Sequence, residues 1–166
     1  MPGVRKFCLI LICTAVAALA PPPAPAASSV DLRMDRLASA LTLLSASDRQ
    51  VVHQAAELIR EGENVGALAR LSTLTHSNAQ NSSLRILIGF VQLKLGNLTG
   101  ALDEAKKAHE APNGNSYKCF FLGKVAYLTG DKATCQRELI HVKSAGDMPE
   151  GVRQLENDLK PGKARN

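Results

Sequence analysis

Histidine and cysteine are the residues of this 166-residue sequence that could most readily carry chemistry. Histidines bind zinc or act as general bases, and on a helix a zinc pair stands four residues apart beside a glutamate. No two histidines here have that spacing, and they fall in separate parts of the chain. We therefore expect solvated surface histidines and no metal site. The four histidines are His53, His76, His109 and His141.

Motifs of catalysis are also missing from the sequence. There is no Gly-x-Ser-x-Gly around a nucleophilic serine, no phosphate-cradling loop and no Gly-x-Gly-x-x-Gly for a dinucleotide. We expect a protein that is not an enzyme and holds no cofactor.

The N-terminus has the layout of a secretory signal peptide over residues 1–27. Arg5 and Lys6 precede an apolar run over residues 7–20, and small residues suited to cleavage follow. A run of this length is short against the about 20 residues of a membrane-spanning helix. We expect an exported protein, periplasmic or extracellular, without stable membrane insertion.

Removal of that segment leaves two cysteines, Cys119 and Cys135. They could form a disulfide in an oxidising compartment, provided that their Cα atoms come within about 7 Å, or remain as two buried thiols. The remaining chain carries 18 basic and 15 acidic side chains, scattered along its length. This is not the basic stripe of a nucleic-acid-binding protein, so we expect no nucleic-acid partner.

The segments on either side of the central region predict capping helices. An Ala/Pro/Ser linker over residues 21–29 leads into residues 28–47, which end the linker and predict an N-terminal capping helix from about residue 31 to 46. Ser47 with Gln50 offers a capping box for the next helix. Residues 150–166 predict a C-terminal amphipathic helix and a basic tail. The apolar face of the first helix consists of Met34, Leu37, Leu41 and Leu44, and that of the last consists of Val152, Leu155 and Leu159.

An internal repeat of three equal units occupies the centre of the chain. Its units are 48–81, 82–115 and 116–149. Each unit predicts two helices of about equal length, separated by a glycine that ends the first helix in the left-handed conformation. Small residues recur where the two helices would approach most closely. The repeated positions are Gly62, Gly96 and Gly130, then Ala55, Gly89 and Gly123, and then Ala67, Ala101 and Cys135.

A 34-residue helix-turn-helix with these small positions resembles the tetratricopeptide repeat. The second unit matches best, with Gly89, Gly96, Asn97, Ala101 and Ala108. The sequence departs from the family where a large aromatic residue usually begins the first helix; Val51, Arg85 and Cys119 stand there instead. The resemblance implies an all-α fold, a short right-handed α-solenoid of about three repeats with flanking capping helices.

The resemblance also implies that the first helix of each unit lines a concave groove. All five aromatic residues outside the signal segment lie on the first helices of units two and three, which suits a groove for an apolar peptide with acidic flanks. Two alternatives stay open: the aromatics are inter-repeat core, or the N-terminal helix folds over the groove and fills it. The predicted groove residues are Ile86, Phe90, Leu93, Lys94, Tyr117, Phe120, Phe121, Lys124 and Tyr127.

These expectations indicate a non-enzymatic adaptor that binds a protein or peptide. The alternative is an assembly chaperone that shields a hydrophobic subunit of the envelope or a secreted complex. An exposed aromatic groove would also suit a homodimer interface.

Overall fold

The computed structural model describes residues 34–160. The predicted signal peptide, the start of the linker and the basic tail after residue 160 lie outside the described residues.

The described chain is all-helical, which confirms the predicted all-α class. It forms eight helices and no strand in residues 34–160. These are α1 (Met34–Leu41), α2 (Ala46–Glu61), α3 (Asn64–Ser72), α4 (Ser82–Lys94), α5 (Leu98–Glu110), α6 (Tyr117–Thr129), α7 (Lys132–Ala145) and α8 (Pro149–Leu159).

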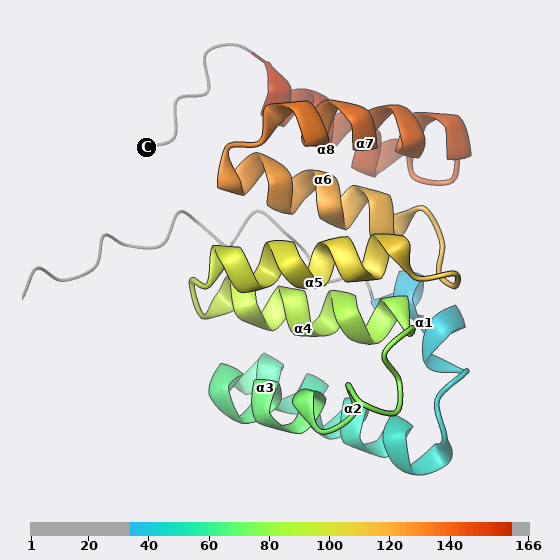
Figure 1. Cartoon of the computed structure of the whole chain (residues 1–166), viewed down its shortest axis with the longest axis vertical. Helices are drawn as coiled ribbons and strands as arrows, with labels where there is room; N and C mark the ends of the chain where they lie inside the picture. Colours follow the sequence, from blue (N-terminus) through green and yellow to red (C-terminus); the bar gives the residue numbers. More distant parts are fainter. Residues whose placement is uncertain (1–33, 161–166) are drawn as a thin grey trace, which may run out of the picture.

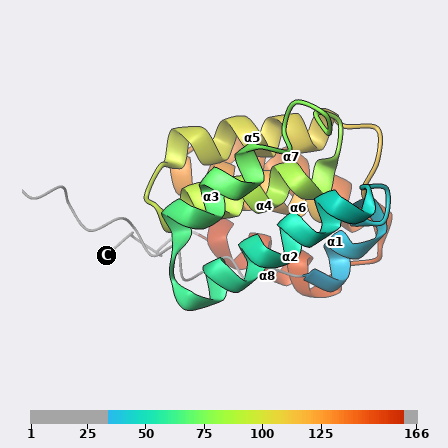
Figure 2. The same cartoon turned by 90° about the horizontal axis from the view of Figure 1, so that it is seen from below.

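The helices pack mainly in chain order. The pairs α2–α3, α4–α5 and α6–α7 form hairpins, and α3 contacts α4 as α5 contacts α6, so that each hairpin rests on the next (Figure 1). Helix α8 packs on α6 and α7, and α1 lies against α4. Seen from below, α5 and α7 lie on one side and α1, α2 and α8 on the other (Figure 2).

The three hairpin turns are built alike, as the repeat predicts. Gly62, Gly96 and Gly130 have φ of 84°, 75° and 91°. At this left-handed φ only glycine avoids a steric penalty. The residue after each glycine donates its backbone N–H to a carbonyl five residues earlier, at 2.8 to 2.9 Å, which satisfies an end carbonyl of the first helix. These turns fix where each first helix ends.

The residue that follows the glycine caps the second helix in units two and three. The Asn97 side chain accepts a hydrogen bond from Gly100 N, and the Asp131 side chain accepts one from Thr134 N. Glu63 makes no such bond in unit one. Its α3 is also the shortest of the three second helices and ends at Ser72, after which residues 73–80 form turns.

Small residues let the two helices of each hairpin touch. Ala55 and Ala67 are fully buried in unit one, and Ala101 and Cys135 in the other two. A Cβ added to Gly89 would lie 2.9 Å from Phe121 Cε1 and 3.4 Å from the Ala101 carbonyl oxygen. The spacing of the helices therefore leaves no room for a larger side chain.

The start of the fold differs from the prediction. Helix α1 ends at Leu41 rather than near residue 46, and α2 begins at Ala46. The predicted capping box of Ser47 and Gln50 is wrong, because Asp48 N donates to Ser45 Oγ at 3.1 Å and Ser45 is the N-cap. The C-terminal helix is present as α8, with Pro149 at its first turn and Leu155 buried.

Helices α4 and α6 form the centre of the core. Ten of the thirteen residues of α4 and nine of the thirteen of α6 are buried, on all sides of each helix. A helix that is apolar all round must be covered by neighbours on every side. Helix α4 contacts α1, α3, α5 and α6, and α6 contacts α4, α5, α7 and α8.

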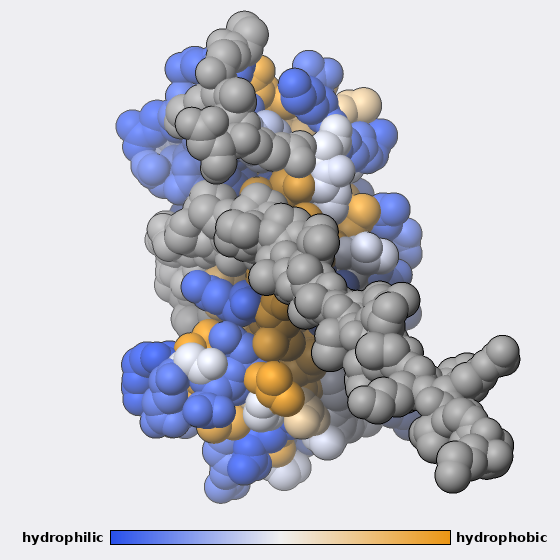
Figure 3. All heavy atoms as spheres, turned by 90° about the vertical axis from the view of Figure 1, so that its left-hand side faces the viewer, coloured by the Kyte–Doolittle hydropathy of each residue, from blue (hydrophilic) through white to orange (hydrophobic). Residues whose placement is uncertain are grey.

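The surface in Figure 3 is mainly hydrophilic, with hydrophobic residues gathered in a band between hydrophilic ones. Among the described residues, no helix combines the length and the apolar character needed to cross a bilayer.

Substitution of Gly89 tests the packing of the second hairpin against the third. We expect Gly89→Ala to lower the free energy of unfolding by about 1 to 3 kcal/mol, because its methyl group would overlap the Phe121 ring. Gly66→Ala is the control: its Cβ would meet only Leu58 Cδ1 at 3.6 Å, so the helix preference for alanine should stabilise the protein by roughly 0.5 kcal/mol. Urea unfolding of both variants measures the difference. Equal stability of the two would contradict the packing described.

Candidate functional site

Most of the predicted groove residues are buried in the core. Seven of the nine are 5% exposed or less: Ile86, Phe90, Leu93, Tyr117, Phe120, Phe121 and Lys124. The prediction that these residues line an open groove is wrong, and the alternative of inter-repeat core holds for them.

Helix α8 covers the predicted groove on α6. A Cβ added to Gly151 of α8 would lie 2.9 Å from Phe120 Cδ2, so this helix packs directly on the Phe120 ring. The Lys124 ammonium lies 2.6 Å from the Asp158 carboxylate of α8. Lys124 thus pairs within the chain and does not present its charge to a ligand.

Phe120 and Phe121 point into two different internal interfaces. Phe121 packs against Gly89 of α4, between the second and third hairpins, whereas Phe120 faces α8 and stacks on Tyr117 at 5.6 Å between ring centroids. Adjacent helix positions diverge by about 100°, so a helix enclosed on all sides buries both.

Helix α1 covers the start of α4. This corresponds to the alternative in which the N-terminal helix folds over the predicted groove. Asn81 and Ser83 donate hydrogen bonds to the Ala40 and Leu37 carbonyls at 2.7 and 2.9 Å, and the Asn115 amide donates to the Arg36 carbonyl at 2.8 Å. These three contacts hold α1 against the start of α4 and against the loop that follows α5.

Two of the nine predicted groove residues stay accessible. Lys94 is exposed, and its ammonium lies 5.3 Å from the centroid of the Phe90 ring. Tyr127 is half-buried.

An apolar pocket remains open at unit one. It has a volume of about 210 Å³ and is lined by one residue of α1 and four of α2. The register explains the space, because Ala56 occupies the position of Phe90 in unit two and Lys124 in unit three. The lining residues are Leu41, Arg49, Val52, His53 and Ala56.

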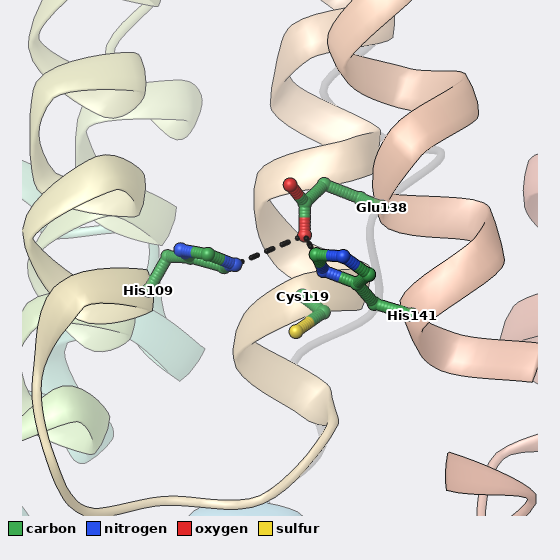
Figure 4. A group of neighbouring side chains, drawn as sticks. All are labelled: His109, Cys119, Glu138 and His141. Atoms are coloured by element: carbon green, nitrogen blue, oxygen red, sulfur yellow. Dashed lines mark ion pairs between the residues drawn. The ribbon is translucent and has the colours of Figure 1, made fainter. Parts of the chain in front are cut away.

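A second feature is a cluster that the sequence did not reveal. One ligand-type atom from each of His109, Cys119, Glu138 and His141 lies within 4.8 Å of the others. Helix α5 supplies His109, α6 supplies Cys119, and α7 supplies Glu138 and His141 (Figure 4). His109 and His141 remain partly exposed, as expected of surface histidines, but the fold brings them together, with their ring centroids 6.1 Å apart.

Glu138 is the buried centre of this cluster. Its side chain is 1% exposed, and its Oε2 lies 3.1 Å from His109 Nε2 and 3.4 Å from His141 Nδ1. Neither contact has the alignment of a hydrogen bond, so Oε2 is buried without a hydrogen-bond partner. Its other oxygen lies 3.5 Å from Arg137 Nε.

Of the two alternatives for the cysteines, the pair of free thiols holds: Cys135 is buried and Cys119 is partly buried. Cys119 lies beside Glu138 and His141 of α7. Burial raises the pKa of both thiols to about 11, and the negative charge of Glu138 adds to the shift at Cys119.

Two sequence signals could have found the cluster. Glu138 and His141 stand three residues apart, on one face of a helix. Cys119 takes the register position of Arg85, so an uncharged metal-ligand type replaces a cation at one repeated site. The position of His109 could not be read in this way, because it depends on how α5 packs on α6.

The rate of alkylation of Cys135 tests its burial. A pKa of about 11 leaves about 0.1% of the thiol ionised at pH 8, and only the thiolate reacts. Because Cys135 is fully buried and its pKa is raised, we expect alkylation at pH 8 to be at least about 100-fold slower in the folded protein than in the urea-unfolded protein. Mass spectrometry after iodoacetamide treatment without reductant measures it. Equal rates in the folded and unfolded protein, or Cys135 recovered in a disulfide, would contradict this account.

No protein-family model matches this chain, and no curated protein matches it. The two features of the described residues that bear on function are the pocket at unit one and the cluster around Glu138. They involve different helices.

Proposed function

We propose that this protein is an exported, non-enzymatic adaptor of the tetratricopeptide type, a short right-handed α-solenoid that binds a polypeptide partner. The support for the repeat assignment is the recurrence of one hairpin in three successive units. Each has a left-handed glycine at its turn and small residues where its helices meet. Export rests on the signal-peptide pattern of residues 1–27.

The observation that carries the binding proposal is the open apolar pocket between α1 and α2. At about 210 Å³ it is below the usual 300 to 1,000 Å³ range of small-molecule sites, and it suits one or two anchoring side chains of a peptide. Its walls are mainly Leu41, Val52 and Ala56. An aliphatic anchor would lose its hydration there.

The charges beside the pocket indicate the rest of the ligand. Arg49 and His53 line it, whereas Arg60, one turn beyond Ala56, is paired with Glu57. The Arg49 guanidinium donates to the Leu44 carbonyl at 2.6 Å, which holds a positive charge at the pocket. We therefore infer a peptide with an aliphatic anchor next to acidic residues.

An assembly chaperone is the alternative function for the same pocket. It would hold a hydrophobic client transiently, whereas an adaptor forms a lasting complex. A second copy of this chain is a further candidate occupant, and sedimentation of the purified protein over a concentration range would detect it.

A charged side chain in the pocket tests peptide binding. We expect peptides selected from a random 12-residue phage library to combine an aliphatic residue with acidic neighbours, and Ala56→Glu to weaken their binding at least tenfold. The carboxylate would occupy the apolar space and repel acidic peptides. Fluorescence anisotropy with the synthetic peptides measures the affinity.

Ala133→Glu is the matched control, because Ala133 is an exposed alanine of α7 far along the chain from the pocket. It should bind the same peptides as the unsubstituted protein does. Selection of no peptide above background, or equal binding by the Ala56→Glu variant, would contradict the proposal.

A further inference from the structure

We propose that His109, Cys119, Glu138 and His141 form a binding site for a zinc ion. This inference does not depend on the peptide-binding proposal, because none of the four residues lines the pocket at unit one.

The second repeat unit shows how a carboxylate at the register position of Glu138 is neutralised. Glu104 is the register equivalent of Glu138, and its side chain is 12% exposed. It pairs with Arg85 at 3.1 Å and with Lys107 at 3.0 Å. Two side chains that are cationic at neutral pH thus compensate the largely buried charge.

The third unit replaces both cations by metal-ligand types. Cys119 stands one repeat period after Arg85, and His141 stands one period after Lys107. The carboxylate is retained and is buried more deeply, at 1% exposure. The position that a guanidinium fills in unit two is therefore open to an external cation in unit three.

Arg137 does not fill that position. Its side chain is 60% exposed, and its Nε approaches Oε1 of Glu138 at 3.5 Å. The other oxygen, Oε2, faces the two histidines and is buried without a hydrogen bond. Buried carboxylate oxygens normally have a partner, so this atom indicates a missing positive group.

The donor set matches the preferences of zinc. One thiolate, two imidazoles and one carboxylate make four ligands of the kinds that zinc binds tetrahedrally. Bonds of about 2.0 to 2.3 Å at tetrahedral angles place neighbouring ligand atoms about 3.3 to 3.8 Å apart. The contacts of 3.1 and 3.4 Å to Glu138 Oε2 are close to that range, and side-chain rotation suffices to bring atoms at up to 4.8 Å into it.

A hydrogen bond from a histidine is the competing way to satisfy Glu138. His109 Nε2 and His141 Nδ1 lie 3.1 and 3.4 Å from Glu138 Oε2, but this oxygen accepts a hydrogen bond from neither ring. A divalent ion between the rings would satisfy both nitrogens and the carboxylate, which makes it the better match to this geometry.

The ion can reach the cluster from solvent. A pocket of about 260 Å³ opens beside it and is lined by His109, Glu138 and His141 among others. The His109 and His141 side chains are 31% and 49% exposed. Bound zinc would join α5, α6 and α7, and so would fasten the second hairpin to the third.

Cobalt serves as a spectroscopic probe of the site, because tetrahedral Co²⁺ absorbs strongly in the visible and a cobalt–thiolate bond adds a near-ultraviolet charge-transfer band. We expect the chelator-treated protein to bind one Co²⁺ with both features, and one equivalent of Zn²⁺ to abolish them. His141→Ala, at a partly exposed position, should weaken Zn²⁺ binding at least about 100-fold. His76→Ala removes an exposed histidine outside the cluster and should leave binding unchanged.

A second variant separates loss of metal from loss of folding. The double substitution Cys119→Arg with His141→Lys installs the pairing that Arg85 and Lys107 make with Glu104. It should melt at or above the temperature of the metal-free protein, gain nothing from added Zn²⁺, and give no cobalt spectrum. The unsubstituted protein should melt at a higher temperature with Zn²⁺ than without it.

The proposal is overturned by failure of the unsubstituted protein to bind Co²⁺ or Zn²⁺ at one equivalent. It is equally overturned by a cobalt spectrum without the thiolate band, or by full binding in either cluster variant, because the ion would then be held elsewhere. If the cluster holds no metal, the unsubstituted protein would bind neither Co²⁺ nor Zn²⁺ at one equivalent.

Discussion

The close approach of the two helices in each hairpin is the constraint on which the rest of this structure depends. Gly89 and Ala101, like Ala55 and Ala67, leave no space between backbones, and the Phe121 ring fills the remaining space beside Gly89. Each hairpin packs on the next, and the constant repeat period places equivalent side chains at equivalent positions. A different residue type at one register position therefore alters the local chemistry but leaves the backbone the same.

The three repeat units share one backbone plan but carry different side chains at equivalent register positions. Unit one has Ala56, where unit two has Phe90 and unit three Lys124, and unit one has an open apolar pocket. In unit two, Arg85 and Lys107 pair with the largely buried Glu104. Unit three keeps the carboxylate and surrounds it with imidazoles and a thiol. The local chemistry therefore differs from unit to unit.

Much of the fold could be predicted from local signals. The positive φ of Gly62, Gly96 and Gly130, the small residues of the hairpins and the helix after Pro149 all follow from residues close in sequence or from their spacing. The groove could not be predicted, because the periodicity of α4 and α6 does not say what covers each face. Helix α8 covers Phe120 and Lys124, and α1 is held by hydrogen bonds from Asn81 and Ser83. Both contacts join segments that are far apart in the sequence.

The cluster around Glu138 likewise could not be predicted in full from local sequence signals. His109 and Glu138 are on different hairpins, and only the packing of α5 on α6 and α7 brings them to 3.1 Å. The sequence shows that Cys119 takes the register position of Arg85, but this difference gains meaning only from Glu138 Oε2, which is buried without a hydrogen bond.

X-ray absorption at the zinc edge of the zinc-loaded protein tests the central claim most directly, since it counts the atoms bound to the ion. This account predicts one sulfur at about 2.3 Å and three nitrogen or oxygen neighbours at about 2.0 to 2.2 Å. A shell of nitrogen and oxygen alone, or one with two or more sulfurs, would show that the ion is not held by His109, Cys119, Glu138 and His141.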